Sequence, residues 1–168
     1  MSQKSGPRGQ ASIKRQVEAI QRKRIVSQKV VDLNDFRSLS KSKQQPTILA
    51  VDDEEIMRNA MKRILEHEGY KVVLAEDAMA LSKVLETVQL DLILLDINLP
   101  WVDGLELCAI LKRHPSLKHV PVVLISGRRS KEDIEKGFAA GCDHYITKPF
   151  EIENMSQVVA KALNKEPA

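Results

Sequence analysis

Charged and hydroxyl-bearing side chains follow the short apolar runs in the C-terminal part of the sequence. Asp52 and Asp53 follow the run TILAV, and Asp96 follows LILL. Ser126 follows VVLI, and Lys148 follows HYIT. If these runs are the strands of a parallel sheet, the positions just after them are where a ligand binds.

The residue types at these positions suit phosphoryl transfer. Asp52, Asp53 and Asp96 would repel one another at a shared sheet edge unless a cation offset their charge. Mg²⁺ is usually held by one or two carboxylates together with phosphate oxygens, and an aspartate can attack phosphorus to form an acyl phosphate. An ammonium and a hydroxyl can stabilise the equatorial phosphoryl oxygens. We therefore expect Mg²⁺ as the cofactor and Asp96 as the phosphoacceptor, assisted by Lys148 and Ser126.

Each of these residues taken alone has a purely structural interpretation. An aspartate after a strand often caps the next helix, which applies to Asp52 and Asp53. Ser126 could be a cap or loop hydroxyl, and Lys148 a solvated surface charge. The order of acid pair, acid, hydroxyl and lysine along successive apolar runs favours the functional interpretation.

The elements that must position these side chains are apparent from the hydrophobic pattern. Nearly continuous apolar runs alternate with helical periods, which is typical of parallel strands covered by helices on both faces. The expected strands cover 47–51, 72–75, 92–95, 122–125 and 144–147, and helices follow each of them. In the first helix, which begins at Glu55, we expect one stripe of Ile56, Ala60, Ile64 and Leu65. The pattern predicts a doubly wound α/β sandwich with a five-stranded parallel sheet.

Charge and composition divide the 168 residues near Pro46. Residues 1–46 carry a net charge of +8 and residues 47–168 a net charge of −5. The stretch SLSKSKQQP, which ends at Pro46, has the composition of a linker. We therefore predict a basic N-terminal arm over 1–46, part helix and part flexible linker, and one domain over 47–168.

The chain is expected to be cytoplasmic. It has neither a run of the ~20 apolar residues that a bilayer span needs nor the apolar core of a secretory signal. Its two cysteines, Cys108 and Cys142, lack metal-ligand spacing, so we expect them to be reduced and buried.

Four segments resemble the receiver (response-regulator) domain of two-component phosphorelays. They are VDDEE at 51–55, LLDINLPWVDG at 94–104, LISG at 124–127 and YITKPF at 145–150, and the resemblance covers about 47–165. It implies a flavodoxin-like fold with strand order 2-1-3-4-5 and phosphorylation of Asp96 by a histidine kinase or histidine phosphotransfer protein. It also implies magnesium held by Asp53, Asp96 and the backbone carbonyl of Asn98, with Asp52 acting mainly through water.

The resemblance further implies how the phosphoryl group is sensed. Ser126 and Tyr145 would form a switch pair, in which the hydroxyl moves toward the phosphoryl group and the ring swings inward. The alternative for Tyr145 is a boundary aromatic with a packed ring and a wet hydroxyl. In the family the bond between Lys148 and Pro149 is usually cis, which would direct the lysine toward Asp96.

The expected function is a phosphorylation-switched signalling module that acts through a downstream protein target, not an enzyme. The alternative is a magnesium-dependent aspartyl-phosphate hydrolase. Hydrolases of that kind normally place a second acid two residues after the nucleophile, where this chain has Asn98.

Because the sequence stops at Ala168, just after the fifth helical period, we expect the output to come from the domain surface or from the basic arm. The arm could bind a partner protein, an acidic membrane surface or nucleic acid, although it contains no recognisable nucleic-acid module. A disordered solubilising tail is the alternative.

Overall fold

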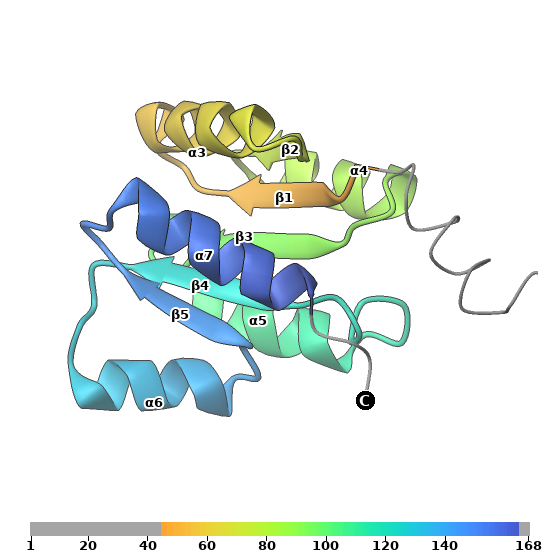
Figure 1. Ribbon diagram of the computed structural model, residues 1–168. Helices are drawn as coiled ribbons and strands as arrows, with labels where there is room; N and C mark the ends of the chain where they lie inside the picture. Colours follow the sequence, from red (N-terminus) through yellow and green to blue (C-terminus); the bar gives the residue numbers. More distant parts are fainter. Residues whose placement is uncertain (1–44, 165–168) are drawn as a thin grey trace, which may run out of the picture. The chain divides into compact units, whose positions relative to one another are not determined.

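Residues 45–164 are described in the computed structural model of the protein, and they form five strands alternating with five helices (Figure 1). The predicted arm, apart from Gln45 and Pro46, lies outside the described residues. The elements in chain order are β1 (Thr47–Val51), α3 (Glu55–His67), β2 (Lys71–Ala75), α4 (Ala78–Thr87), β3 (Leu92–Asp96), α5 (Gly104–Arg113), β4 (Val122–Ser126), α6 (Lys131–Ala139), β5 (His144–Thr147) and α7 (Ile152–Leu163).

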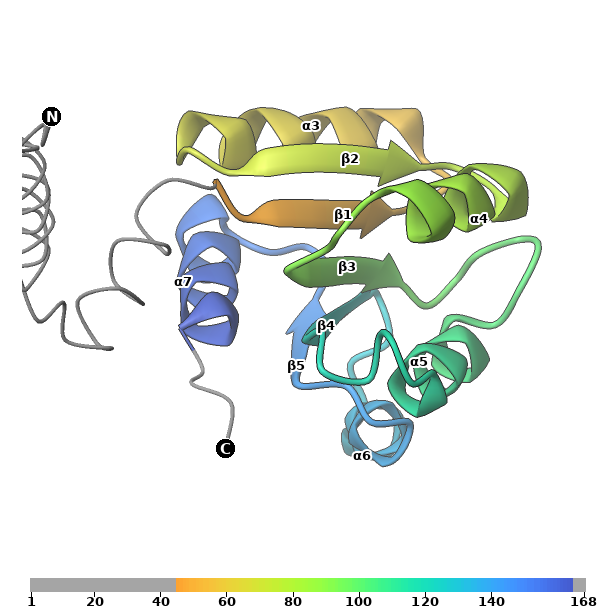
Figure 2. The same ribbon diagram turned by 90° about the vertical axis from the view of Figure 1, so that its right-hand side faces the viewer.

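The strands form one parallel sheet with the order β2-β1-β3-β4-β5. Helices α3 and α7 cover one face of the sheet, and α4, α5 and α6 cover the other (Figures 1 and 2). The predicted fold class and strand order are therefore confirmed. Each predicted strand agrees with the structure to within one residue at either end.

The apolar composition of the strands follows from their place in the sheet. Every residue of β1, β3 and β4 is buried, because these strands have a neighbour on each side and helices on both faces. The edge strands β2 and β5 are only partly buried. Successive side chains alternate between two cores, so that Leu49 packs on one face and Ile48 on the other.

The predicted stripe of α3 is wrong in its first half. Ile56 is 86% exposed and Ala60 is exposed, whereas Met61 and Leu65 are buried. Met61 and Leu65 are four residues apart and therefore share a helix face, which is turned toward the sheet. Ile56 and Ala60 occupy the adjacent row, which the sheet does not cover.

Helices α4, α5 and α6 begin at side-chain caps, whereas α3 and α7 do not. Asp77 Oδ1 accepts a 2.8 Å hydrogen bond from the Ala80 N–H at the start of α4. Asp103 Oδ1 accepts a 2.7 Å hydrogen bond from the Leu105 N–H at the start of α5. Such caps satisfy N–H groups that have no partner within the helix. They fix where the loops beside the sheet edge end.

Gly104 allows α5 to begin directly against the end of β3. A Cβ atom at this position would overlap the main chain of Asp96 and Ile97. The Gly104 N–H also donates a 2.9 Å hydrogen bond to the Ile97 carbonyl. The loop after Asp96 is therefore folded back tightly on its own strand.

Cys108 and Cys142 are buried and free, as expected. Burial raises the pKa of Cys108 to about 11 and that of Cys142 to about 12. Both thiols are therefore protonated near neutral pH. Among residues 45–164, no helix is long and apolar enough to cross a membrane.

Candidate functional site

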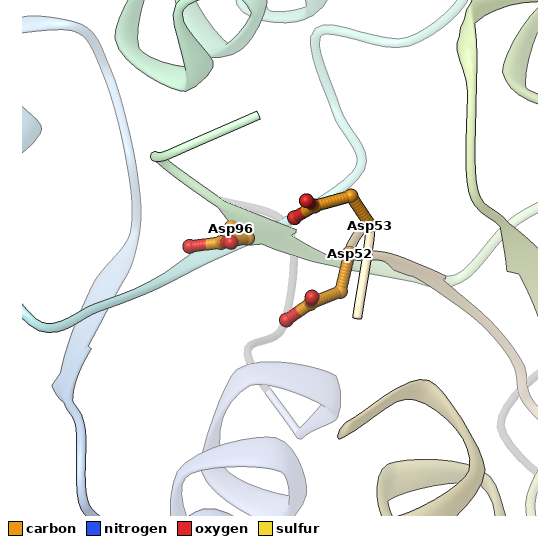
Figure 3. A group of neighbouring side chains, drawn as sticks. All are labelled: Asp52, Asp53 and Asp96. Atoms are coloured by element: carbon orange, nitrogen blue, oxygen red, sulfur yellow. The ribbon is translucent and has the colours of Figure 1, made fainter. Parts of the chain in front are cut away.

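Three carboxylates meet at the carboxyl edge of the sheet (Figure 3). Asp52 and Asp53 follow β1, Asp96 ends β3, and these two strands are neighbours. One carboxylate oxygen from each of the three residues lies within 4.8 Å of the others. Asp52 and Asp96 are buried, whereas Asp53 is exposed. The cluster is therefore anchored in the domain and open to solvent on one side.

Asp52 is held by several contacts. Its Oδ1 atom accepts a 2.8 Å hydrogen bond from the Glu54 N–H at the entry to α3, and its Oδ2 atom accepts a 3.0 Å bond from Lys148 Nζ. The main-chain carbonyl of Asp52 accepts a 2.7 Å bond from Arg58 Nη1. Asp52 therefore bonds the main chain at the entry to α3 as well as belonging to the acidic cluster, although α3 itself has no side-chain cap.

Lys148 is the cation that faces the cluster. Its Nζ atom lies 3.0 Å from Asp52 Oδ2 and 3.6 Å from Asp96 Oδ2. The bond between Lys148 and Pro149 is cis, in agreement with the expectation from the family resemblance. Burial by itself lowers the pKa of Lys148, but the carboxylates of Asp52 and Asp96 outweigh this effect and raise it. The ammonium is therefore charged at neutral pH.

The pKa of Asp96 is raised above its usual value. Burial is the main cause, and the Asp52 and Asp53 carboxylates add to it. The Lys148 ammonium and the hydrogen bond from the Asn98 N–H, 3.3 Å from Asp96 Oδ1, oppose the rise without cancelling it. Burial and the neighbouring carboxylates therefore disfavour the charged form of Asp96, even with the Lys148 ammonium close by.

This arrangement fits a hard divalent cation. All the ligand atoms offered are carboxylate oxygens, which Mg²⁺ prefers, and a cation would offset the repulsion among the three carboxylates. A pocket of about 570 Å³ adjoins the cluster. Its lining includes Asp53, Asn98, Trp101 and Arg128. The acidic cluster is thus typical of a magnesium site.

Ser126 and Tyr145 lie next to the cluster and are joined through the main chain of one residue. Ser126 is wholly buried, and its Oγ atom accepts a 3.1 Å hydrogen bond from the Arg128 N–H. The Tyr145 hydroxyl donates a 3.0 Å hydrogen bond to the Arg128 carbonyl. The Tyr145 ring is half-buried against Gly137 of α6. The structure thus brings both residues of the predicted pair into contact with Arg128, in the loop that follows β4.

Two contacts near the site were not anticipated from the sequence. Arg58 reaches the Asp52 carbonyl from the first turns of α3, and Trp101 Nε1 donates a 3.3 Å hydrogen bond to the Glu76 carbonyl. The position of Arg58 soon after the acidic pair is the sequence signal that could have indicated its contact with Asp52. The partner of Trp101 lies 25 residues away, and no sequence pattern indicates it.

The fold and the acidic cluster together define a CheY-like α/β module of two-component signalling. Residues 48–160 match the response regulator receiver domain, and the chain belongs to this family.

Curated relatives carry the same domain within longer proteins. The aerobic respiration control protein ArcA of Escherichia coli (strain K12) is 37% identical over 121 residues, which are 72% of this chain and 48% of the relative. The DNA-binding dual master transcriptional regulator RpaA of Synechocystis sp. is 35% identical over 120 residues, which are 71% of this chain and 50% of that protein. The chain thus spans about half the length of these relatives.

Solved structures share the fold. The chemotaxis response regulator CheY4 of Vibrio cholerae has a TM-score of 0.66 and 28% identity, covering 71% of this chain and 100% of that chain. A putative response regulator from Chloroflexus aurantiacus J-10-fl has a TM-score of 0.68 and 28% identity, covering 73% and 100%.

Proposed function

We propose that the protein is a phosphorylation-switched signalling module whose phosphoacceptor is Asp96. A histidine kinase or a histidine phosphotransfer protein would donate the phosphoryl group, in the cytoplasm, and a downstream protein would read the result. The observation that carries the proposal is the convergence of three carboxylates within 4.8 Å, with the Lys148 ammonium 3.6 Å from Asp96 Oδ2.

The residues of the cluster have separate roles in this proposal. Asp53, Asp96 and the backbone carbonyl of Asn98 would hold the magnesium ion, with Asp52 acting mainly through water. When bound, magnesium supplies positive charge to the carboxylates and to the phosphoryl oxygens. The closeness of the three carboxylates supports this assignment, because a divalent cation would offset their mutual repulsion.

The transfer itself requires one bond to form and one to break. An Asp96 carboxylate oxygen attacks phosphorus, and the bond from phosphorus to the donor imidazole nitrogen breaks. The leaving nitrogen keeps the electron pair of that bond, and the ring, which carries a proton on its other nitrogen, leaves as neutral imidazole. Lys148 then moves its hydrogen bond from the Asp52 carboxylate to a phosphoryl oxygen, where its charge stabilises the negative charge of the product.

The phosphoryl group is sensed through Ser126 and Tyr145. The Ser126 hydroxyl turns from its contact with the Arg128 N–H toward a phosphoryl oxygen, and the Tyr145 ring moves into the space that it leaves. Both residues contact Arg128, which supports a coupled response. The response would alter the surface formed by α6, β5 and α7, which the downstream protein contacts.

The test is phosphorylation with a small acyl-phosphate donor and magnesium. We expect one acid-stable, base-labile phosphoryl group for each wild-type chain and none on Asp96→Asn. Phosphorylation of Asp96→Asn at the wild-type rate would disprove the assignment. Hydrolysis of phosphomonoesters far beyond one equivalent would instead favour the hydrolase.

A further inference from the structure

Arg128 contacts three residues of the candidate site at once. Its N–H donates to Ser126 Oγ at 3.1 Å, and its carbonyl accepts from the Tyr145 hydroxyl at 3.0 Å. Its side-chain Nε donates to Asn98 Oδ1 at 3.1 Å. The first two contacts use the main chain, and any residue could make them. The third depends on the arginine side chain.

The contact between Arg128 and Asn98 joins two loops beside the acidic cluster. Arg128 lies in the loop between β4 and α6, and Asn98 lies in the loop between β3 and α5. The side chains belong to residues 30 positions apart. Both residues line the pocket that also includes Asp53. The hydrogen bond therefore joins two residues that line the same pocket as Asp53, the exposed member of the cluster.

Asn98 connects this contact to Asp96. The Asn98 N–H donates to Asp96 Oδ1 at 3.3 Å, and Asn98 pairs with Asp103 in an isolated antiparallel bridge. In the proposed function the Asn98 carbonyl is a magnesium ligand. A side-chain contact that fixes Asn98 also fixes the orientation of its main-chain groups. When the protein already holds a ligand group in place, metal binding carries a smaller free-energy cost for ordering that group.

We propose that Arg128 is a positioning residue for the metal site. Its Nε–H holds the Asn98 side chain through Oδ1. The main-chain carbonyl of Asn98 is thereby oriented toward a divalent cation beside Asp53 and Asp96. This inference rests on the magnesium site of the proposed function.

The charge of Arg128 and its hydrogen bond have opposite effects on magnesium binding. A guanidinium near the cluster repels a divalent cation, so charge alone predicts tighter binding when Arg128 is replaced by a neutral residue. Positioning predicts weaker binding when the hydrogen bond is lost. The direction of the change therefore separates the two effects.

Two neutral substitutions isolate the hydrogen bond. Arg128→Gln places an amide nitrogen at the same number of bonds from Cα as Nε, and it keeps an N–H donor without the charge. Arg128→Met has a similar length and no donor. The two variants remove the same charge and differ in the hydrogen bond, and both retain the main-chain contacts to Ser126 and Tyr145.

The experiment is a magnesium chloride titration of the full chain, without a phosphoryl donor, followed by calorimetry and by Trp101 fluorescence. We expect Arg128→Gln to bind magnesium at least as tightly as wild type, and Arg128→Met about three- to tenfold more weakly than Arg128→Gln, in keeping with one hydrogen bond. In an Asn98→Ala background, which keeps the carbonyl, the difference between Gln and Met should vanish.

Equal affinities for Arg128→Gln and Arg128→Met would overturn the inference, as would a difference that persists with Asn98→Ala. In the metal-free protein, amide exchange of residues 97–103 should be faster in Arg128→Met than in Arg128→Gln, and equal rates would also contradict the inference. Absence of Asp96 phosphorylation together with this order of magnesium affinities would disprove the proposed function and leave the role of Arg128 intact.

Discussion

The Lys148 ammonium donates a 3.0 Å hydrogen bond to Asp52 Oδ2, and the Asp52 side chain is only 1% exposed. This pair places a positive charge within the acidic cluster before any metal binds. A bound divalent cation would take over part of that role and release Lys148 for the phosphoryl group. In the proposed function, the pair would therefore link metal binding to the position of the lysine.

Removal of this internal cation should destabilise the metal-free fold. We expect Lys148→Met to lose about 3 kcal/mol of unfolding free energy at neutral pH, because the buried Asp52 side chain is left without its ion-pair partner. Denaturant unfolding in the presence of a chelator measures the loss, and magnesium should restore part of it by binding the folded state.

Lys131→Met is the matched control for that substitution. Lys131 pairs with Glu135 on the surface of α6, and its side chain is 91% exposed. Such a pair contributes about 0.5 kcal/mol or less. An equal loss for the two variants would show that Lys148 contributes no more than an ordinary surface charge.

Asp96→Asn should stabilise the metal-free protein at neutral pH. The folded-state pKa of Asp96 is raised, so folding favours its protonated form. Stability from this group is fully present below its unfolded pKa and is lost as the pH rises through the folded value. Asparagine carries no charge, so the variant does not lose this unfolding free energy at neutral pH.

The measurement is a pair of thermal unfolding series for wild type and Asp96→Asn with chelator present. The advantage of the variant should be greatest near pH 7 and should shrink as the pH falls through the folded pKa of Asp96. Added magnesium should favour wild type. An advantage that does not change with pH would contradict a raised pKa.

The strands could be predicted because they follow from the local apolar pattern. The meeting of Asp52 and Asp96 also requires β1 and β3 to be neighbours, which the family resemblance implies and the structure shows. The buried face of α3 could not be predicted in the same way. Ile56 and Met61 lie on adjacent rows of the helix, and packing against the sheet determines which row is buried. The contact between Asn98 and Arg128 also depends on how two loops fold.

Gly137→Ala should have opposite effects on the unfolding free energy when Tyr145 is present and when it is replaced by alanine. A glycine inside a helix costs about 1 kcal/mol relative to alanine. A Cβ at residue 137, however, would lie 2.7 Å from Tyr145 Cδ2 and force the ring aside. We expect Gly137→Ala to lower the unfolding free energy by about 1 to 2 kcal/mol with Tyr145 present and to raise it in Tyr145→Ala.

A double-mutant cycle measured by chemical denaturation gives the coupling between the two positions. A stabilising effect of Gly137→Ala in both backgrounds would show that the ring does not require the glycine. The reversal of sign would identify α6 as the surface on which the Tyr145 ring rests.

A chain that begins at Gln45 should fold, bind magnesium and accept phosphate as the full chain does. The first strand begins at Thr47, and the Pro46 carbonyl, which accepts a 2.9 Å hydrogen bond from the Lys71 N–H, is retained. The candidate site residues lie between Asp52 and Lys148, so the truncation removes none of them.

The basic residues before the domain should make salt-sensitive contacts. Because residues 1–46 carry a net charge of +8, any contact they make with an acidic partner should weaken with salt, since screening at physiological ionic strength acts over about 8 Å. The two chains should be compared by thermal unfolding, by acyl-phosphate labelling and by partner capture at low and high salt. Failure of the shorter chain to fold or to be labelled would show that the domain begins before Pro46.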